Sequence, residues 1–126
     1  MSRITEIEIA GKKYPLNFSV KAAKEVSKRY GGVENVTEAF SSGRVDEMMD
    51  EATWILAVLI EQGSAYKKII DGEEIKAPTK EELEIIMGVS DFANIQDTLM
   101  GAMTAGMERE VEVESDPKND KTTQGK

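Results

Sequence analysis

An alternation of apolar and polar residues opens the chain and predicts a β-hairpin. One face of this alternation carries Thr5, Ile7, Ile9, Tyr14, Leu16 and Phe18. A period of two places these side chains on the same side of a strand pair. The central residues Ala10-Gly11-Lys12-Lys13 suit a turn. Pro15 has no amide hydrogen, which predicts an edge position for the second strand or limits its pairing.

Helical spacing of apolar residues begins after the predicted hairpin. Ser19 is suited to cap a first helix, which Gly31-Gly32 ends, and a short second helix is predicted around 34–40. The third helix, from Val45 to about Gln62, is apolar nearly all round and is therefore expected to be buried at the centre of the fold. Residues 66–70 could continue it before a turn at 71–74. Its apolar positions are Met48, Ala52, Trp54, Ile55, Leu56, Val58, Leu59 and Ile60.

Two further helices are predicted in the second half of the chain. Thr79 and Glu82 match a capping box at the start of a fourth helix, and Gly88 ends it. Ser90 or Asp91 would cap a fifth helix. The apolar stripe of this fifth helix is Phe92, Ile95, Leu99, Met103 and Met107.

The pattern changes after the fifth helix. Residues 108–114 alternate glutamate with arginine or valine, which predicts a short strand able to pair with the hairpin. Residues 115–126 have no apolar side chain to bury, so a disordered tail is predicted there. We therefore expect an α+β fold that is predominantly α-helical, with one globular domain over 1–114 and a polar tail over 115–126.

Net charge narrows the classes of partner. The chain carries a formal charge of −8, which argues against nucleic acid, because binding to phosphate backbones depends mainly on Lys and Arg. Residues 1–30 run against this trend with seven basic and three acidic side chains, so a nucleic-acid-binding first helix stays as an alternative. The longest apolar run, 54–60, is too short to span a bilayer, and no signal-like segment is present. A cytoplasmic protein without membrane contact is expected.

Histidine and cysteine are both absent, which removes most enzyme chemistry. Neither a Ser-His-Asp triad, nor a cysteine nucleophile, nor a His or Cys zinc site can form. Residues 71–82 have the length of a calcium loop, but Ile75 and Lys76 stand where an oxygen ligand and a glycine are needed. No glycine-rich phosphate loop is present. We predict a non-enzymatic protein without metal or cofactor.

The fifth helix offers a candidate partner-binding surface. Small residues recur four apart, as Gly101 with Ala105 and as Ala102 with Gly106, so another backbone could approach closely. Methionine adapts to varied apolar partners. Core filling is the alternative role for the two methionines on the stripe, whereas Met100 lies off it. The residues predicted to border the partner surface are Phe92, Met100, Met103 and Met107.

The order of these features resembles that of tail assembly chaperones of long-tailed phages and prophages of Gram-positive bacteria. The resemblance covers nearly the whole chain and rests on strand and core positions. Its segments are Ile7-Glu8-Ile9-Ala10-Gly11-Lys12-Lys13-Tyr14-Pro15-Leu16-Asn17-Phe18, Tyr30-Gly31, Trp54-Ile55-Leu56-Ala57 and Asp116-Pro117-Lys118-Asn119.

This resemblance implies a client and a mode of action. Such chaperones coat the tape measure protein in the host cytoplasm until tail tube subunits polymerise around it, and they are absent from the finished virion. A ribosomal frameshift gives a longer form that is thought to recruit tail tube protein; here Gln124-Gly125-Lys126 could be encoded by a slippery heptamer. Self-association stays open. Two alternatives are a minor structural tail protein, which would polymerise through strand edges, and a small nucleic-acid-binding regulator.

Overall fold

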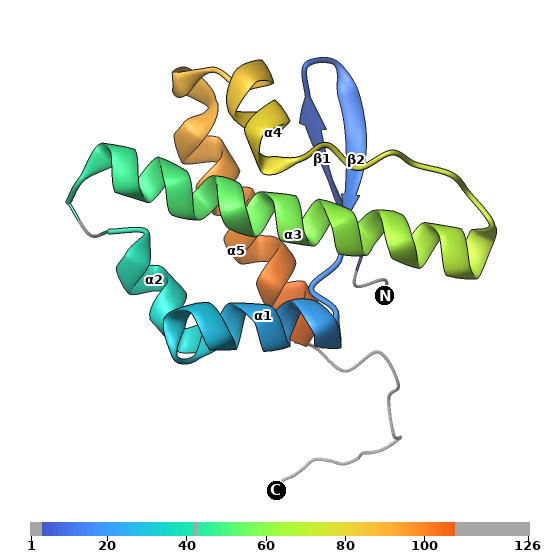
Figure 1. The fold of residues 1–126 in the computed structure, drawn as a ribbon, viewed down its shortest axis with the longest axis horizontal. Coiled ribbons are helices and arrows are strands. Elements are labelled where there is room, and N and C mark those ends of the chain that lie inside the picture. Colours follow the sequence, from blue (N-terminus) through green and yellow to red (C-terminus); the bar gives the residue numbers. More distant parts are fainter. Residues whose placement is uncertain (1–3, 42, 108–126) are drawn as a thin grey trace, which may run out of the picture.

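A β-hairpin followed by five α-helices makes up residues 4–41 and 43–107, the part of the chain that the computed structural model describes (Figure 1). The fold is mostly helical, as predicted, and two short 3₁₀ turns interrupt the helical part. The predicted strand at 108–114 and tail at 115–126 lie outside the described residues. The elements are β1 (Thr5–Ile9), β2 (Lys12–Leu16), α1 (Val20–Tyr30), η1 (Val33–Asn35), α2 (Val36–Ala39), α3 (Val45–Asp71), α4 (Lys80–Ile86), η2 (Val89–Asp91) and α5 (Phe92–Met107).

The hairpin turns through two residues, Ala10 and Gly11, whose φ angles are +53° and +79°. Positive φ at both positions is the mark of a type I′ turn, whose twist matches that of the strands it joins. Because Ile9 and Lys12 flank this turn, they form a hydrogen-bonded pair, and the pairs then alternate along the ladder. Pro15, opposite Glu6, falls on a non-hydrogen-bonded pair. Its missing N–H therefore costs the hairpin no ladder bond.

Helix α3 is the central element, as its apolar pattern predicts, and it crosses β2 at very short range. Gly63 marks the crossing, because a Cβ atom there would lie 2.1 Å from the carbonyl oxygen of Pro15. Just beyond the strand, the amide of Asn17 donates to the carbonyl oxygen of Leu59 at 3.1 Å. The helix continues past its predicted end near Gln62 as far as Asp71. It continues because Gly63 is buried against β2, and a left-handed Gly72 ends it.

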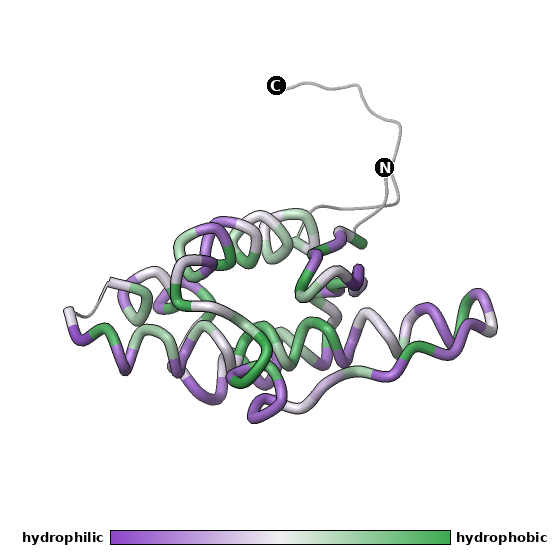
Figure 2. The backbone as a smooth tube through the Cα atoms, turned by 90° about the horizontal axis from the view of Figure 1, so that it is seen from above, coloured by the Kyte–Doolittle hydropathy of each residue, from purple (hydrophilic) through white to green (hydrophobic). Residues whose placement is uncertain are grey.

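The remaining elements pack around α3. Helix α5 crosses behind it, the hairpin stands behind its second half, and α1 lies below (Figures 1 and 2). The segment 72–79 runs back along α3 to reach α4. Fully buried side chains from all of these elements form one apolar core, and the largest are Leu16, Val26, Val36, Ile55, Leu56, Leu59, Ile60, Leu83 and Leu99. Within 4–41 and 43–107, no helix is long and apolar enough to cross a membrane.

Several predicted helix ends are confirmed, among them the end of α1 at Gly31 and the start of α3 at Val45. The Ser19 hydroxyl accepts from the amide of Ala22, and Thr79 and Glu82 form a reciprocal capping box. The second helix is shorter than predicted, because its first turn is the 3₁₀ segment η1. Residues 89–91 also form a 3₁₀ turn, in which the Asp91 carboxylate accepts from the amide of Gly88 at 3.1 Å. Helix α5 consequently starts at Phe92 without the expected serine or aspartate cap.

Candidate partner-binding site

A cleft of about 290 Å³ opens where α3, α4 and the start of α5 meet. We call it the methionine cleft. Its walls come from three segments that are far apart in the sequence: the first half of α3, the end of α4 with the turn after it, and the first turn of α5. The lining residues are Asp46, Met49, Asp50, Thr53, Glu84, Met87, Gly88, Val89, Phe92 and Ile95.

The methionine cleft combines apolar walls with an acidic rim. Met49 on α3 and Met87, just after α4, both line it, and both are unbranched side chains that can repack around varied shapes. Val89, at the mouth, is 76% exposed, and the neighbouring Ile86 is also exposed. Exposed apolar side chains beside an apolar cleft are typical of a surface that another molecule covers. The rim carries the carboxylates of Asp46, Asp50 and Glu84, which are paired with Arg44 and Lys80. The remaining net negative charge would favour a partner with basic residues beside its apolar ones.

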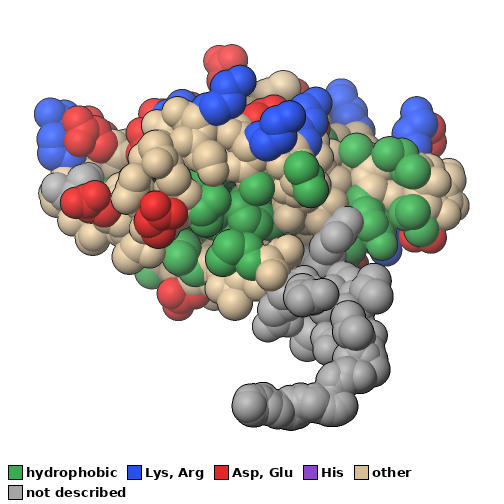
Figure 3. Space-filling model, turned by 90° about the horizontal axis from the view of Figure 1, so that it is seen from below, with side chains coloured by type: hydrophobic (Ala, Val, Ile, Leu, Met, Phe, Trp, Pro, Cys, Tyr) green, Lys and Arg blue, Asp and Glu red, His purple; other side chains and the backbone are tan. Residues whose placement is uncertain are grey.

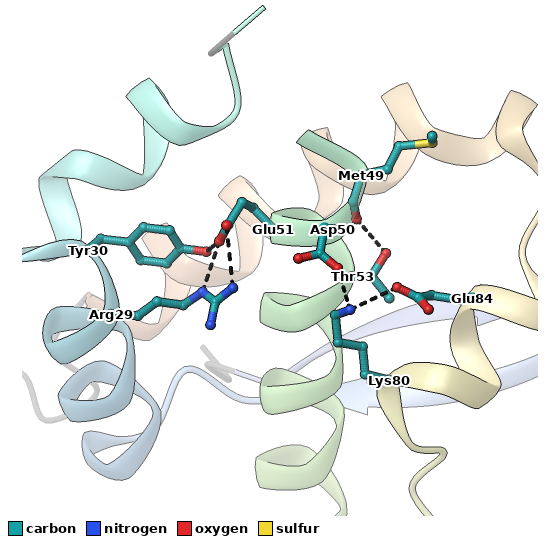
Figure 4. A network of polar contacts seen from close by, with 8 residues as sticks. All are labelled: Arg29, Tyr30, Met49, Asp50, Glu51, Thr53, Lys80 and Glu84. Carbon is teal, nitrogen blue, oxygen red and sulfur yellow. Dashed lines mark hydrogen bonds and ion pairs between the residues drawn. The ribbon is translucent and has the colours of Figure 1, made fainter. Parts of the chain in front are cut away.

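One lysine joins the two helices that form the cleft wall. The ammonium of Lys80 on α4 lies between the carboxylates of Asp50 on α3 and Glu84, and it donates to the latter at 2.8 Å (Figure 4). Hydrogen bonds to these carboxylates, that to Asp50 first, raise the pKa of Lys80. Thr53 satisfies its hydroxyl within α3, where it donates to the carbonyl oxygen of Met49 at 2.7 Å. These polar side chains of the cleft wall are therefore paired within the protein.

A second polar cluster ties α1 to α3. Glu51 accepts from the Arg29 guanidinium at 2.9 Å and from the Tyr30 hydroxyl at 2.6 Å (Figure 4). The same guanidinium lies 4.5 Å from the ring centre of Trp54. Partial burial opposes ionisation of Glu51, but the hydrogen bonds from Arg29 and Tyr30 outweigh it and lower the pKa of this carboxyl. Burial raises the pKa of Tyr30 strongly. This cluster holds α1 against α3, and none of its members lines the methionine cleft.

Glu51→Gln is expected to destabilise the protein by about 1 kcal/mol at neutral pH, because it removes a charge-assisted contact that is only partly exposed. A lowered folded-state pKa gives stability that is present above the ordinary glutamate value, about 4.3, and is lost as pH falls through the folded value. The difference between wild type and variant should therefore shrink below about pH 4. Urea unfolding at several pH values measures it. The control is Glu47→Gln, in a more exposed ion pair of the same helix, which should cost under about 0.5 kcal/mol. A loss of stability in Glu51→Gln that does not change with pH would contradict the expectation.

The four residues predicted to border a partner surface do not lie together. Phe92 lines the methionine cleft, and Met103 is buried in the core with 2% of its surface exposed. Met100 is half-buried against the core. Met107 is 62% exposed, but it lies at the other end of α5, about 22 Å from Phe92 along the helix axis. Only Phe92 belongs to the cleft, and the partner role predicted for this set stays a prediction.

The small residues of α5 serve two different purposes. A Cβ atom on Gly106 would lie 2.5 Å from the Cβ of Phe18, so this glycine allows the helix end to pack closely within the domain. Its neighbour four residues earlier, Ala102, is buried. Gly101, by contrast, faces open space. The close approach that Ala102 and Gly106 allow is therefore a contact within the domain.

The sequence interpretation missed the cleft residues outside α5. Met49 lies on α3, whereas Met87 and Val89 lie in the segment after α4, and no periodicity relates the two segments. One signal was present: residues 85–89 are apolar except for Gly88, which is unusual for a helix end followed by a turn. The structure exposes part of this run at the mouth of the cleft.

Other exposed apolar groups lie away from the methionine cleft. Ile69 and Ile70 are 79% and 62% exposed at the projecting end of α3. The face seen from below shows apolar side chains in its middle and a further group at this projecting end (Figure 3). Among the described residues, no group of three acidic side chains is placed to hold a metal ion. Comparisons with protein-family models, with curated proteins and with solved structures gave no match to this chain.

Proposed function

We propose that this protein is a tail assembly chaperone of a long-tailed phage or prophage, which binds the tape measure protein and keeps it soluble while the tail tube assembles. The observation that carries the proposal is the methionine cleft, an apolar site built for a varied partner. The family resemblance supplies the name of the client. A longer frameshifted form would add contact with tail tube protein. The role requires binding alone and no catalysis.

Cleft size and flexibility suit a helical client. At about 290 Å³ the cleft lies near the lower end of the range for ligand pockets, about 300–1,000 Å³, and can take apolar side chains from one face of a helix. Met49 and Met87 can adjust to different side chains, as a chaperone needs when its client presents many similar stripes. Contacts of this kind give moderate affinity, which allows release when tube subunits arrive.

Charge supports the same role. The net charge of −8 would keep many chaperone copies soluble along one client through mutual repulsion. At the cleft, the acidic rim would also discriminate against acidic client segments. We therefore expect the preferred client segments to be amphipathic helices with Lys or Arg beside the apolar stripe.

Val89→Asp is expected to abolish most of the client protection in cells that co-express a tape measure fragment. An unpaired carboxylate would be buried at the contact, which should weaken binding by roughly tenfold or more. The soluble fraction of the fragment, measured after centrifugation, should fall accordingly. Val89 is largely exposed in the free protein, so the variant should fold normally.

Ile69→Asp is the matched control. This isoleucine is as exposed as Val89 but lies about 30 Å from Met49 along α3. Client solubility should stay at the wild-type level in this control. If Val89→Asp protects the fragment as well as wild type does, the methionine cleft is not the client site. Equal losses in both variants would point to a general effect of added charge and would also count against the proposal.

One observation favours a structural tail protein as the second candidate. Within the described part of the chain, β1 is an edge strand of a two-stranded sheet, and open strand edges can pair with another protein. Mass spectrometry of purified phage particles separates the two functions, because a chaperone should be missing from them and a structural protein should be present.

A further inference from the structure

Among the described residues, none forms a strand on the outer edge of β1. Because Ile7 and Ile9 use their N–H and C=O groups in the ladder to β2, those of Glu6 and Glu8 point the other way. Both glutamates are exposed. Within 4–41 and 43–107, no backbone hydrogen bond joins Glu6 or Glu8 to another element. Such an edge is a template for one more strand.

The other edge of the sheet is closed. Pro15 has no N–H to offer on the outer side of β2, and its carbonyl oxygen lies against the backbone of α3 at Gly63. Beyond it, the amide of Asn17 is already bonded to the carbonyl oxygen of Leu59. Since β2 is blocked from Pro15 onward, a further strand of several residues joins this sheet more readily at β1.

A second cleft, of about 370 Å³, lies between β1 and the start of α5. We call it the strand-edge cleft. It shares Met87 and Ile95 with the methionine cleft, so the two clefts are adjacent. Its lining residues are Ile7, Glu8, Ile9, Ala10, Gly11, Met87, Asp91, Asn94 and Ile95. Side chains of an added strand that stand opposite Ile7 and Ile9 would point toward the buried side of the sheet.

We propose that the edge of β1 binds an extended segment of a partner protein in which apolar residues alternate with Lys or Arg. The backbone of this segment pairs with Glu6 and Glu8, its basic side chains lie beside those two carboxylates, and its apolar side chains stand beside Ile7 and Ile9 at the border of the strand-edge cleft. This mode is strand addition, in which backbone bonds give affinity and alternate side chains give selectivity. The proposal stands on the hairpin geometry and is independent of the client function proposed above.

Charge selects this occupant over a second copy of the chain. Full-length antiparallel pairing of two β1 strands would place Glu6 of each copy opposite Glu8 of the other, and like charges directly opposite are destabilising. The glutamate-rich segment 108–114 would bring the same repulsion. Basic side chains opposite Glu6 and Glu8 would be attracted to these carboxylates instead.

Peptide binding to the full chain tests the proposal. The probe is a short peptide that alternates lysine and valine, and its control is the same peptide with every lysine amide N-methylated. Methylation keeps the charge but removes the N–H groups that would pair with Glu6 and Glu8, so we expect the dissociation constant to rise by about tenfold or more. Backbone amide signals of β1 should shift with the unmethylated peptide only. Equal binding of both peptides would reduce the effect to general attraction by an acidic protein and overturn the proposal.

Charge reversal supplies the second arm. The double variant Glu6→Lys with Glu8→Lys should lose binding of the lysine–valine peptide by about tenfold and gain binding of a glutamate–valine peptide. Both positions are exposed, so folding should be kept. The double variant should still protect a tape measure fragment, whereas Val89→Asp should still bind the peptide, which separates failure of this proposal from failure of the client proposal. A dimer of the free chain that the peptide dissociates would assign the edge to a second copy and overturn it.

Discussion

Gly63→Ala is expected to destabilise the protein by about 3 kcal/mol or more, since overpacking against a backbone cannot be relieved by a change of rotamer. A Cβ atom at this position would lie 2.1 Å from the carbonyl oxygen and 2.4 Å from the carbonyl carbon of Pro15. Either α3 or β2 must move, and both belong to the core. Urea unfolding followed by the fluorescence of Trp54, the only tryptophan, measures the loss.

Gly101→Ala is the control for this substitution. Both glycines are inside helices, but a Cβ atom on Gly101 would meet nothing within 4 Å. Alanine there should stabilise the protein by about 0.5–1 kcal/mol, because it restricts the unfolded chain and favours the helix. If Gly63→Ala behaves like Gly101→Ala, the hairpin does not rest on α3 as closely as described.

The elements of this fold could be predicted because each has a strong local signal. The alternation around Gly11 is confirmed as a hairpin, and the all-round apolar pattern after Val45 is confirmed as the central helix. The length of α3 could be predicted only in part: a continuation over 66–70 was expected as an option, but the unbroken passage through Gly63 was not. Gly63 is weakly helix-forming by itself, and only its contact with β2 explains why a glycine is needed there and why the helix continues through it.

The candidate site was much harder to predict. Sequence reasoning placed all four partner residues on α5, where a single stripe is visible, but a stripe does not show which of its members the rest of the fold covers. Burial of Met103 and exposure of Met107, only four residues apart, depend on what packs against the last turns of the helix. The methionine cleft needs Met49 from α3 beside Phe92 from α5, and that proximity is a tertiary property with no local signal.

The start of α5 connects the two proposed sites. Met87 and Ile95 line both clefts, so a substitution at either residue would disturb both kinds of binding. Val89 belongs to the methionine cleft only and Glu6 to the β1 edge only, so a substitution at either one should disturb a single kind of binding. If both sites are occupied at once, one partner could present a helix to the methionine cleft and an extended segment to β1.

Leu99→Ala is expected to destabilise the protein by about 3 kcal/mol, through lost burial and the cavity that remains. Leu99 is fully buried near the middle of α5, between Ile95 and Met103 on the apolar stripe. Its packing holds α5 against the core, and with it the shared wall of both clefts. The free energy of unfolding, from urea titration, should fall while the slope of the transition stays unchanged.

The volume-conserving Leu99→Met variant separates cavity formation from a general sensitivity of α5. It should cost less than about 1.5 kcal/mol, because methionine fills similar space and is as good a helix former as leucine. At temperatures where Leu99→Ala is still folded, Val89→Asp should remain the more damaging variant for client protection, since Leu99 reaches neither cleft. A loss below about 1 kcal/mol in Leu99→Ala would show that α5 is not packed into the core as the structure places it.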